Sequence, residues 1–170
     1  MNDPIRAGFL KEQCREAIEM SAHSDLVQIH AVEGDPPDRY LARFRCKGLV
    51  RDSDGAIREH DDFTFGIWFP EDYLRRVEAR LVVAMAPPWN VWHPNVTYGA
   101  PFICPGHLVP GTCLRDIVHQ IFDVLTYNKW AAHDPLNEAA AQFARTEKHR
   151  FPIDRRPFRR AAAAKIGGAT

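Results

Sequence analysis

The residues best suited to chemistry lie in one stretch, where an asparagine, Asn95, is followed nine residues later by a cysteine, Cys104. No histidine stands in an obvious position to act as a base for this cysteine. The combination is typical of acyl transfer through a thioester, in which a thiol is the nucleophile and an amide N–H is aimed at the developing oxyanion. The sequence therefore indicates a group-transfer site around Cys104.

Short motifs surround this pair in a fixed order. Phe69-Pro70-Glu71-Asp72-Tyr73 comes first, His93-Pro94-Asn95 follows, and Gly99, Ile103-Cys104 and Asp134-Pro135-Leu136 come after them. Each motif alone is weakly specific, but the ordered set over roughly residues 63–145 resembles the core of the ubiquitin-conjugating enzymes. Leu74 after the tyrosine and Pro105-Gly106 after the cysteine depart from the family pattern. These departures indicate a divergent branch of the family. We expect this branch among the prokaryotic conjugation systems, some of which are antiphage.

The resemblance implies a role for each site residue. Cys104 is expected to accept a ubiquitin-like modifier from an activating enzyme as a thioester and to pass it to an amine of a target protein. Asn95 is expected to organise the loop and stabilise the oxyanion, and Asp134 to orient the incoming lysine. His93 and Pro94 are expected to be structural. No cofactor is implied.

Plainer roles for the same residues stay open. A lone free cysteine is most often a small buried hydrophobe, and an asparagine after proline often bonds its own loop. Asp134 precedes Pro135 at a predicted helix start, so it is equally a candidate helix cap. His133, beside it, is a weaker candidate for the catalytic task.

Other kinds of site also stay open. A cysteine hydrolase would use Cys104 with His93 or His107, and a catalytically silent binding module of the same fold would lack the acceptor cysteine, which is present. Zinc-ligand types occur at Cys104, His107, Cys113 and His119, but their spacing matches no common zinc pattern, so we expect no metal.

Composition limits the partners. The 170 residues fit one domain, and 22 basic and 22 acidic residues leave no net charge to attract nucleic acid or an anionic membrane. No stretch approaches the ~20 apolar residues of a membrane span, and the four cysteines lack a disulfide-framework spacing. We therefore expect a cytoplasmic protein.

Two basic patches are candidate partner surfaces. One lies on the first predicted helix, which in the family helps to bind the activating enzyme, and consists of Arg6, Lys11 and Arg15. The other is the Arg-rich segment 155–160, which is either a solvated end or a dock for an acidic partner.

Apolar periodicity predicts an α+β fold like that of the ubiquitin-conjugating enzymes. A helix is expected from Pro4, after the cap Asp3, to about Met20, with Ile5, Phe9, Leu10, Ala17 and Ile18 as its apolar positions. Alternation predicts strands at residues 27–31, 40–46, 63–69 and 81–85, joined into a four-stranded antiparallel meander with a turn at 52–55.

An irregular active-site segment is predicted after the last strand, at residues 86–112, with Trp89 and Trp92 sheltering it. A crossover helix from Leu114 is expected to pack on the sheet, and another is expected from about Leu136 to Lys148, with Ala139, Ala140 and Phe143 facing inward. We assign residues 1–150 to the catalytic domain. Residues 151–170 are assigned to a basic, Ala-rich extension with a short helix.

Overall fold

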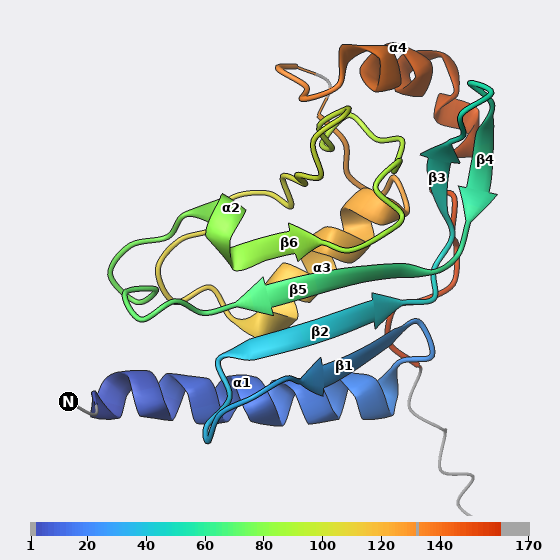
Figure 1. Ribbon diagram of the computed structural model, residues 1–170. Coiled ribbons are helices and arrows are strands. Elements are labelled where there is room, and N and C mark those ends of the chain that lie inside the picture. The colour runs from blue at the N-terminus through green and yellow to red at the C-terminus, as the bar shows by residue number, and fades with distance from the viewer. Residues whose placement is uncertain (1–2, 132, 161–170) are drawn as a thin grey trace, which may run out of the picture.

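A four-stranded antiparallel sheet flanked by helices forms the centre of the computed structural model, which describes residues 3–131 and 133–160 (Figure 1). The sheet has the order β1-β2-β5-β6, so the predicted meander is confirmed. Its strands are β1 (Val27–Ala31), β2 (Arg39–Phe44), β5 (Phe63–Trp68) and β6 (Val83–Met85). The helices are α1 (Pro4–His23), α2 (Ala79–Val82), α3 (Leu114–Leu125), α4 (Glu138–Thr146) and the 3-10 turn η1 (Lys148–Arg150).

Strict alternation places the large side chains of the sheet on one face. Tyr40, Ala42 and Phe44 of β2 are buried, as are Phe63 and Phe65 of β5. The apolar stripe of α3 joins them in a single core, as predicted, and this covers the inner face of the sheet. The α+β class, the N-terminal helix and the crossover helix are therefore confirmed.

Helix α1 begins as its sequence predicts. The Asp3 carboxylate accepts a hydrogen bond of 2.9 Å from the backbone N–H of Ile5, and Pro4 takes the first helical position. The buried stripe contains Leu10 and Ala17, but Ile5 and Ile18 are exposed, so their predicted inward placement is wrong. The sheet covers a narrower arc of this helix than its apolar residues span.

A hairpin that the predicted meander lacks is inserted between β2 and β5. Its strands are β3 (Gly48–Arg51) and β4 (Ile57–His60), and the turn at residues 52–55 joins these two. The turn was expected to lead directly into the central strand. Leu49 and Val50 are both buried, so β3 shows no alternation by which to recognise it.

The last predicted strand, 81–85, is also corrected. The one-turn helix α2 covers Leu81 and Val82, and only Val83–Met85 pairs with β5. Leu81 is exposed and Val82 is buried next to Val83, because the helical turn interrupts the alternation expected of a strand.

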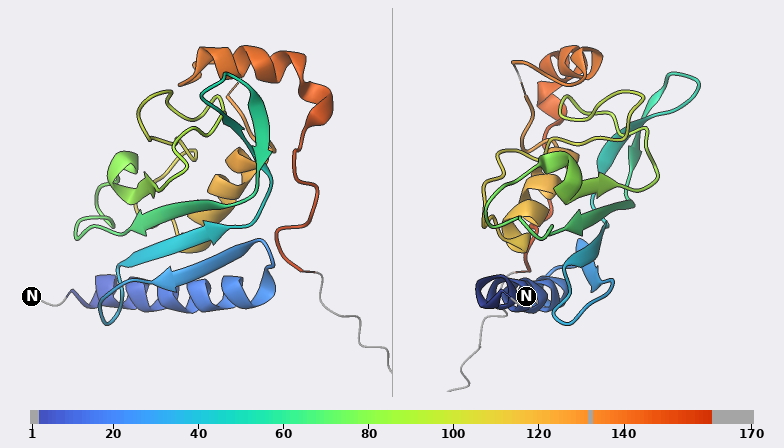
Figure 2. Two further views of the ribbon diagram at one scale, coloured as in Figure 1. Left: turned by 45° about the vertical axis from the view of Figure 1, so that its right-hand side comes forward. Right: turned by 60° about the vertical axis from the view of Figure 1, so that its left-hand side comes forward.

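The two ends of the sheet are closed by different elements. Helix α1 runs along the β1 side, whereas α4 lies at the far end beside the β3–β4 hairpin (Figure 2). A second small core is buried there, made of Leu49, Trp92, Tyr127, Ala140 and Ala144.

The predicted domain boundary at residue 150 is not a break in packing. Beyond it, the Phe158 ring lies 4.6 Å from that of Phe122, and the Asp154 carboxylate accepts a 2.8 Å hydrogen bond from the backbone N–H of Lys47. Residues 151–160 contain no helix and are part of the folded unit. The remainder of the predicted extension, residues 161–170, lies outside the described residues.

Candidate active site

The His93-Pro94-Asn95 loop is fixed by a histidine that is fully enclosed. Nδ1 of His93 accepts a 2.9 Å hydrogen bond from the backbone N–H of Asn95, and Nε2 donates to the carbonyl of Lys129 at 3.1 Å. Burial lowers the pKa of His93 to about 3, so the imidazole is neutral at physiological pH. Both ring nitrogens serve the backbone, and His93 is therefore not free to act as a base for Cys104.

The Asn95 side chain joins two segments instead of bonding its own loop. Its Nδ2 donates to the carbonyl of Cys104 at 3.3 Å, and its Oδ1 accepts a 2.8 Å bond from the backbone N–H of Ala131. The backbone adds a third contact, from the Cys104 N–H to the Asn95 carbonyl at 2.8 Å. Asn95 is only 8% exposed, so these bonds hold it in one position.

Cys104 lies on a short, well-anchored turn. Ile103 before it is fully buried and forms an isolated bridge with Val96, and Pro105 after it is buried. Cys104 itself is half-buried, which leaves part of the residue accessible.

Two of the other thiols are poor candidates for the nucleophile. Burial raises the pKa of Cys46 to about 12 and that of Cys113 to about 11. Because the thiolate is the reactive species, these two cysteines are largely inert near neutral pH.

Asp134, which the sequence left open as a helix cap or a catalytic residue, does not cap helix α4. Helix α4 is capped by Asn137, whose Oδ1 accepts a 3.0 Å bond from the backbone N–H of Ala140. Asp134 is exposed with φ of 52°, and within residues 3–131 and 133–160 its carboxylate makes no hydrogen bond or ion pair. Its loop is nevertheless tied to the site, because the N–H groups of Leu136 and Asn137 both donate to the Pro94 carbonyl.

Helix α4 is also shorter than predicted. It spans Glu138–Thr146, and Ala140 and Ala144 face the core, whereas Ala139 is exposed. Phe143 is half-buried with its ring 6.4 Å from that of Trp92.

Of the two tryptophans expected to shelter the irregular segment, only one does. Trp92 is 4% exposed, and its carbonyl accepts a hydrogen bond from the Tyr127 hydroxyl. Trp89 is 59% exposed, so its predicted role is wrong.

The alternative ligand set for zinc is dispersed in the fold. His119 packs its ring 4.5 Å from Phe158, at the α1–α3 side. Across the described part of the chain, no three His, Cys, Asp or Glu side chains are grouped to hold a metal ion.

The basic patch predicted on α1 is largely paired. Arg6 reaches Asp38 at 3.2 Å and the Phe69 carbonyl at 3.1 Å. Arg15 binds Glu12 and Glu19, and Lys11 is exposed. Most of the positive charge of this helix is thus engaged within the chain.

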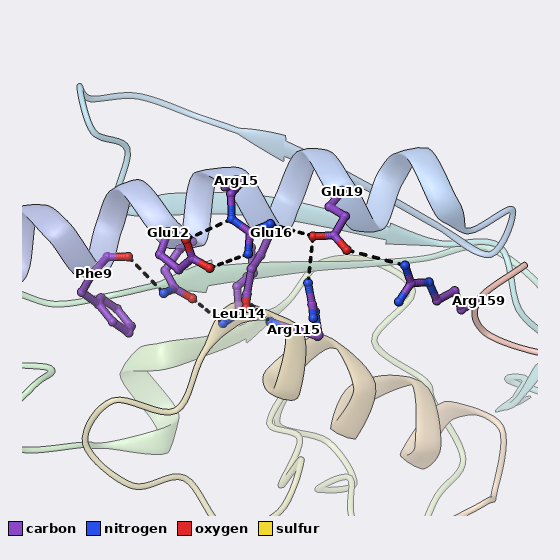
Figure 3. Close-up of polar contacts among 9 residues, drawn as sticks. Phe9, Glu12, Arg15, Glu16, Glu19, Leu114, Arg115 and Arg159 are labelled. Atoms are coloured by element: carbon purple, nitrogen blue, oxygen red, sulfur yellow. Dashed lines mark hydrogen bonds and ion pairs between the residues drawn. The ribbon is translucent and has the colours of Figure 1, made fainter. Parts of the chain in front are cut away.

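The Arg-rich segment 155–160 is likewise paired. Arg156 binds Asp154 at 2.7 Å, and Arg160 lies 3.5 Å from Asp25. Figure 3 shows the interface beside it, where Glu19 binds Arg115 at 3.1 Å and Arg159 at 3.6 Å. These contacts fasten the segment to α1 and α3.

Sequence reasoning missed two residues beside the site. Asn137 stands directly before Glu-Ala-Ala-Ala, a recognisable N-cap signal, but Asp134-Pro135 upstream offers a competing one. The other is Lys129, which the fold brings to Gly106, just past Cys104. The two residues are far apart in sequence, so no local signal was available.

No family model matches this sequence, and no curated protein matches it. Among solved structures, the chain is similar to the E2 domain of a ubiquitin-conjugating enzyme from Toxoplasma gondii. The two are 19% identical with a TM-score of 0.49, and the match covers 85% of this chain and 90% of that one. Among the described residues, no helix has the length and apolar character needed to cross a membrane.

Proposed function

We propose that this chain is a conjugating enzyme for a ubiquitin-like protein, with Cys104 as the acceptor. The observation that carries the proposal is the bond between the Asn95 amide and the carbonyl of a half-buried Cys104. It supports the proposal because the chemistry needs an amide donor close to a cysteine that is partly accessible.

The proposed reaction has two steps. In the first, the Cys104 thiolate attacks the thioester held by an activating enzyme, so a new Sγ–C bond forms and the old S–C bond breaks. Exchange between thiols of similar leaving ability needs little driving force. In the second, an amine of the target attacks the carbonyl carbon, the N–C bond forms, Cys104 leaves as thiolate, and the amine loses a proton.

Asn95 and Asp134 are proposed to act in the second step. Nδ2 of Asn95 carries two hydrogens, and the Cys104 carbonyl uses one of them. The other can face the oxyanion, and one such donor can be worth ~2.7–4 kcal/mol of barrier. Asp134 is exposed on a loop fastened to Pro94, where it would orient an incoming lysine.

The same geometry disfavours a cysteine hydrolase. His93 uses both ring nitrogens elsewhere, and within the described residues His107 makes no hydrogen bond to Cys104. A catalytically silent binding module is the remaining alternative, and it would not form a thioester.

A charging assay separates these functions. The protein is incubated with Mg-ATP and a panel of activating enzymes, each with its own ubiquitin-like modifier, and analysed on gels with and without reducing agent. We expect one pair to give a thiol-sensitive adduct that Cys104→Ala abolishes. Equal charging of Cys104→Ala would overturn the site, and the absence of any adduct across the panel would favour the silent module.

A further inference from the structure

The amine of Lys129 lies over the turn that follows the proposed acceptor. A Cβ built on Gly106 would be 2.6 Å from Lys129 Nζ. A carbon–carbon bond adds about 1.5 Å, so Nζ is within roughly 4 Å of the Gly106 Cα. Gly106 is two residues from Cys104, a span of at most about 7 Å. The amine is therefore close enough for a long, rotatable side chain to reach a group on Cys104.

The backbone around Lys129 is fastened to the same site. Its carbonyl accepts the bond from His93 Nε2, and two residues later the Ala131 N–H bonds to the Asn95 side chain. That asparagine in turn binds the carbonyl of Cys104. These hydrogen bonds fix the position of the Lys129 backbone relative to that of Cys104.

The surroundings of the amine favour a nucleophile over a structural cation. Among residues 3–131 and 133–160, no carboxylate pairs with Lys129, whereas Lys47 pairs with Glu59 at 3.5 Å. Oε1 of Gln120 lies 2.8 Å from the same Cβ position on Gly106, is enclosed, and has no hydrogen-bond partner in the described chain. Both atoms lie against the same position, so Gln120 offers an unused acceptor close to the Lys129 amine.

Lysine is scarce in the rest of the chain. Only five of its 22 basic residues are lysines, at positions 11, 47, 129, 148 and 165. Lys11 is on α1 and Lys148 is in η1, after α4. Few competing amines are therefore available to an acyl group on Cys104.

We propose that Lys129 is an intramolecular acceptor, so that the chain acylates itself there when no target amine is present. The inference rests on the proposed function, in which Cys104 carries an acyl group as a thioester. Lys129 Nζ attacks the thioester carbonyl, the Nζ–C bond forms and the Sγ–C bond breaks. The amine proton goes to solvent and Cys104 returns as a free thiolate. The product is an isopeptide beside an active site that can be charged again.

A chemical thioester tests this step without an activating enzyme. A short peptide ending in Gly-Gly, as its mercaptoethanesulfonate thioester, exchanges onto accessible thiols. After excess reagent is removed, the fraction of amide-linked peptide is measured by mass spectrometry under reducing conditions, and its position by peptide mapping. The same measurement is made on Cys104→Ser, Lys129→Arg and, as a matched control, Lys148→Arg.

We expect the amide to map to Lys129, at a rate that does not change over a tenfold range of protein concentration. Lys129→Arg should lose it by at least about tenfold while Cys104 is acylated as before, because an amine held beside the carbonyl reacts at a high effective concentration. Lys148→Arg should match the unchanged protein, and Cys104→Ser should give no Lys129 amide. Amide spread over other lysines, a rate proportional to concentration, or no acylation of Cys104 would overturn the inference. Charging by an activating enzyme with no Lys129 product would overturn the inference alone and leave the proposed function intact.

Discussion

Gln13, in the middle of α1, caps a helix that begins about a hundred residues later. Its side-chain oxygen accepts a 2.6 Å hydrogen bond from the backbone N–H of Leu114, and its side-chain nitrogen donates to the Phe9 carbonyl at 3.0 Å. The N-cap residue of α3, Cys113, provides no side-chain bond, and Glu16 bonds the next N–H, that of Arg115, at 3.0 Å. The first helix therefore supplies to α3 what a local cap would normally supply.

Gln13→Ala should destabilise the fold by about 1–3 kcal/mol, since it leaves the buried N–H of Leu114 without an acceptor. Urea unfolding monitored by circular dichroism gives the free energy of unfolding. Gln28→Ala, the same truncation at an exposed position of β1, is the control and should change it by less than about 0.5 kcal/mol. Equal losses in the two variants would contradict the capping role.

Cys104→Ser should trap the modifier as an ester that survives reducing agent and is cleaved by hydroxide. Cys113→Ser should still charge as a reducible thioester, because the raised pKa of Cys113, about 11, leaves little thiolate near neutral pH. Gels run with reducing agent, and with alkali, distinguish the two adducts. Loss of charging in a folded Cys113→Ser variant, with normal charging of Cys104→Ala, would transfer the nucleophile to Cys113.

Asn95→Ala should slow discharge of the thioester to free lysine by ~10²–10³-fold, the usual cost of losing one oxyanion donor. Charging should be affected far less. The rate of discharge to free lysine is measured in a single-turnover assay. Asn90→Ala serves as the control, since Asn90 lies in the same irregular segment and its side chain donates to the Arg51 carbonyl, not to Cys104. Unchanged discharge in Asn95→Ala would leave Asn95 with a purely structural role.

Asp154→Asn should cost about 2 kcal/mol of stability at pH 7, and less in acid. Burial alone would raise the pKa of Asp154, but hydrogen bonds from the Arg156 side chain and from the backbone N–H groups of Lys47 and Arg156 outweigh it and hold the pKa at about 2. The folded state thus binds the proton more weakly than the unfolded state. The stabilisation is complete above about pH 4 and is lost as the pH falls toward 2.

Chemical denaturation of both proteins between pH 7 and pH 2 checks this dependence. The difference between wild type and Asp154→Asn should narrow steadily below about pH 4. A difference that stays constant over the whole range would mean that the carboxylate charge is not what stabilises the C-terminal segment.

Local patterns were enough to predict the central sheet. The side chains from Phe63 to Phe69 alternate without interruption, and a strand half-buried on one face is the simplest structure that fits them. The start of α1 was equally predictable, because Asp3 and Pro4 specify a helix start by themselves. The hairpin at 48–60 was not, since Leu49 and Val50 are buried together by contacts with α4 and the irregular segment.

The candidate site also has one part that could be predicted from the sequence and one part that could not. The order of Asn95, Cys104 and Asp134 along the chain identified the candidate residues, and their spacing predicted a shared centre. The hydrogen bonds of Asn95 to Ala131 and of His93 to Lys129 join segments about 36 residues apart, and only the folded chain brings them together. The approach of Lys129 to Gly106 has the same origin and was therefore out of reach from the sequence.

The packing of residues 151–160 has a consequence for how the chain folds during its synthesis. Lys47 N–H, the Ser24 hydroxyl and the His23 carbonyl all belong to the first third of the chain, yet their partners are Asp154, Phe158 and Arg160. These partners are synthesised more than a hundred residues later, so the three polar groups stay hydrated until residues 154–160 have left the ribosome. Contacts of such long sequence separation form slowly. The fold is thus completed only after residues 154–160 have been synthesised, even though most of its core residues are made earlier.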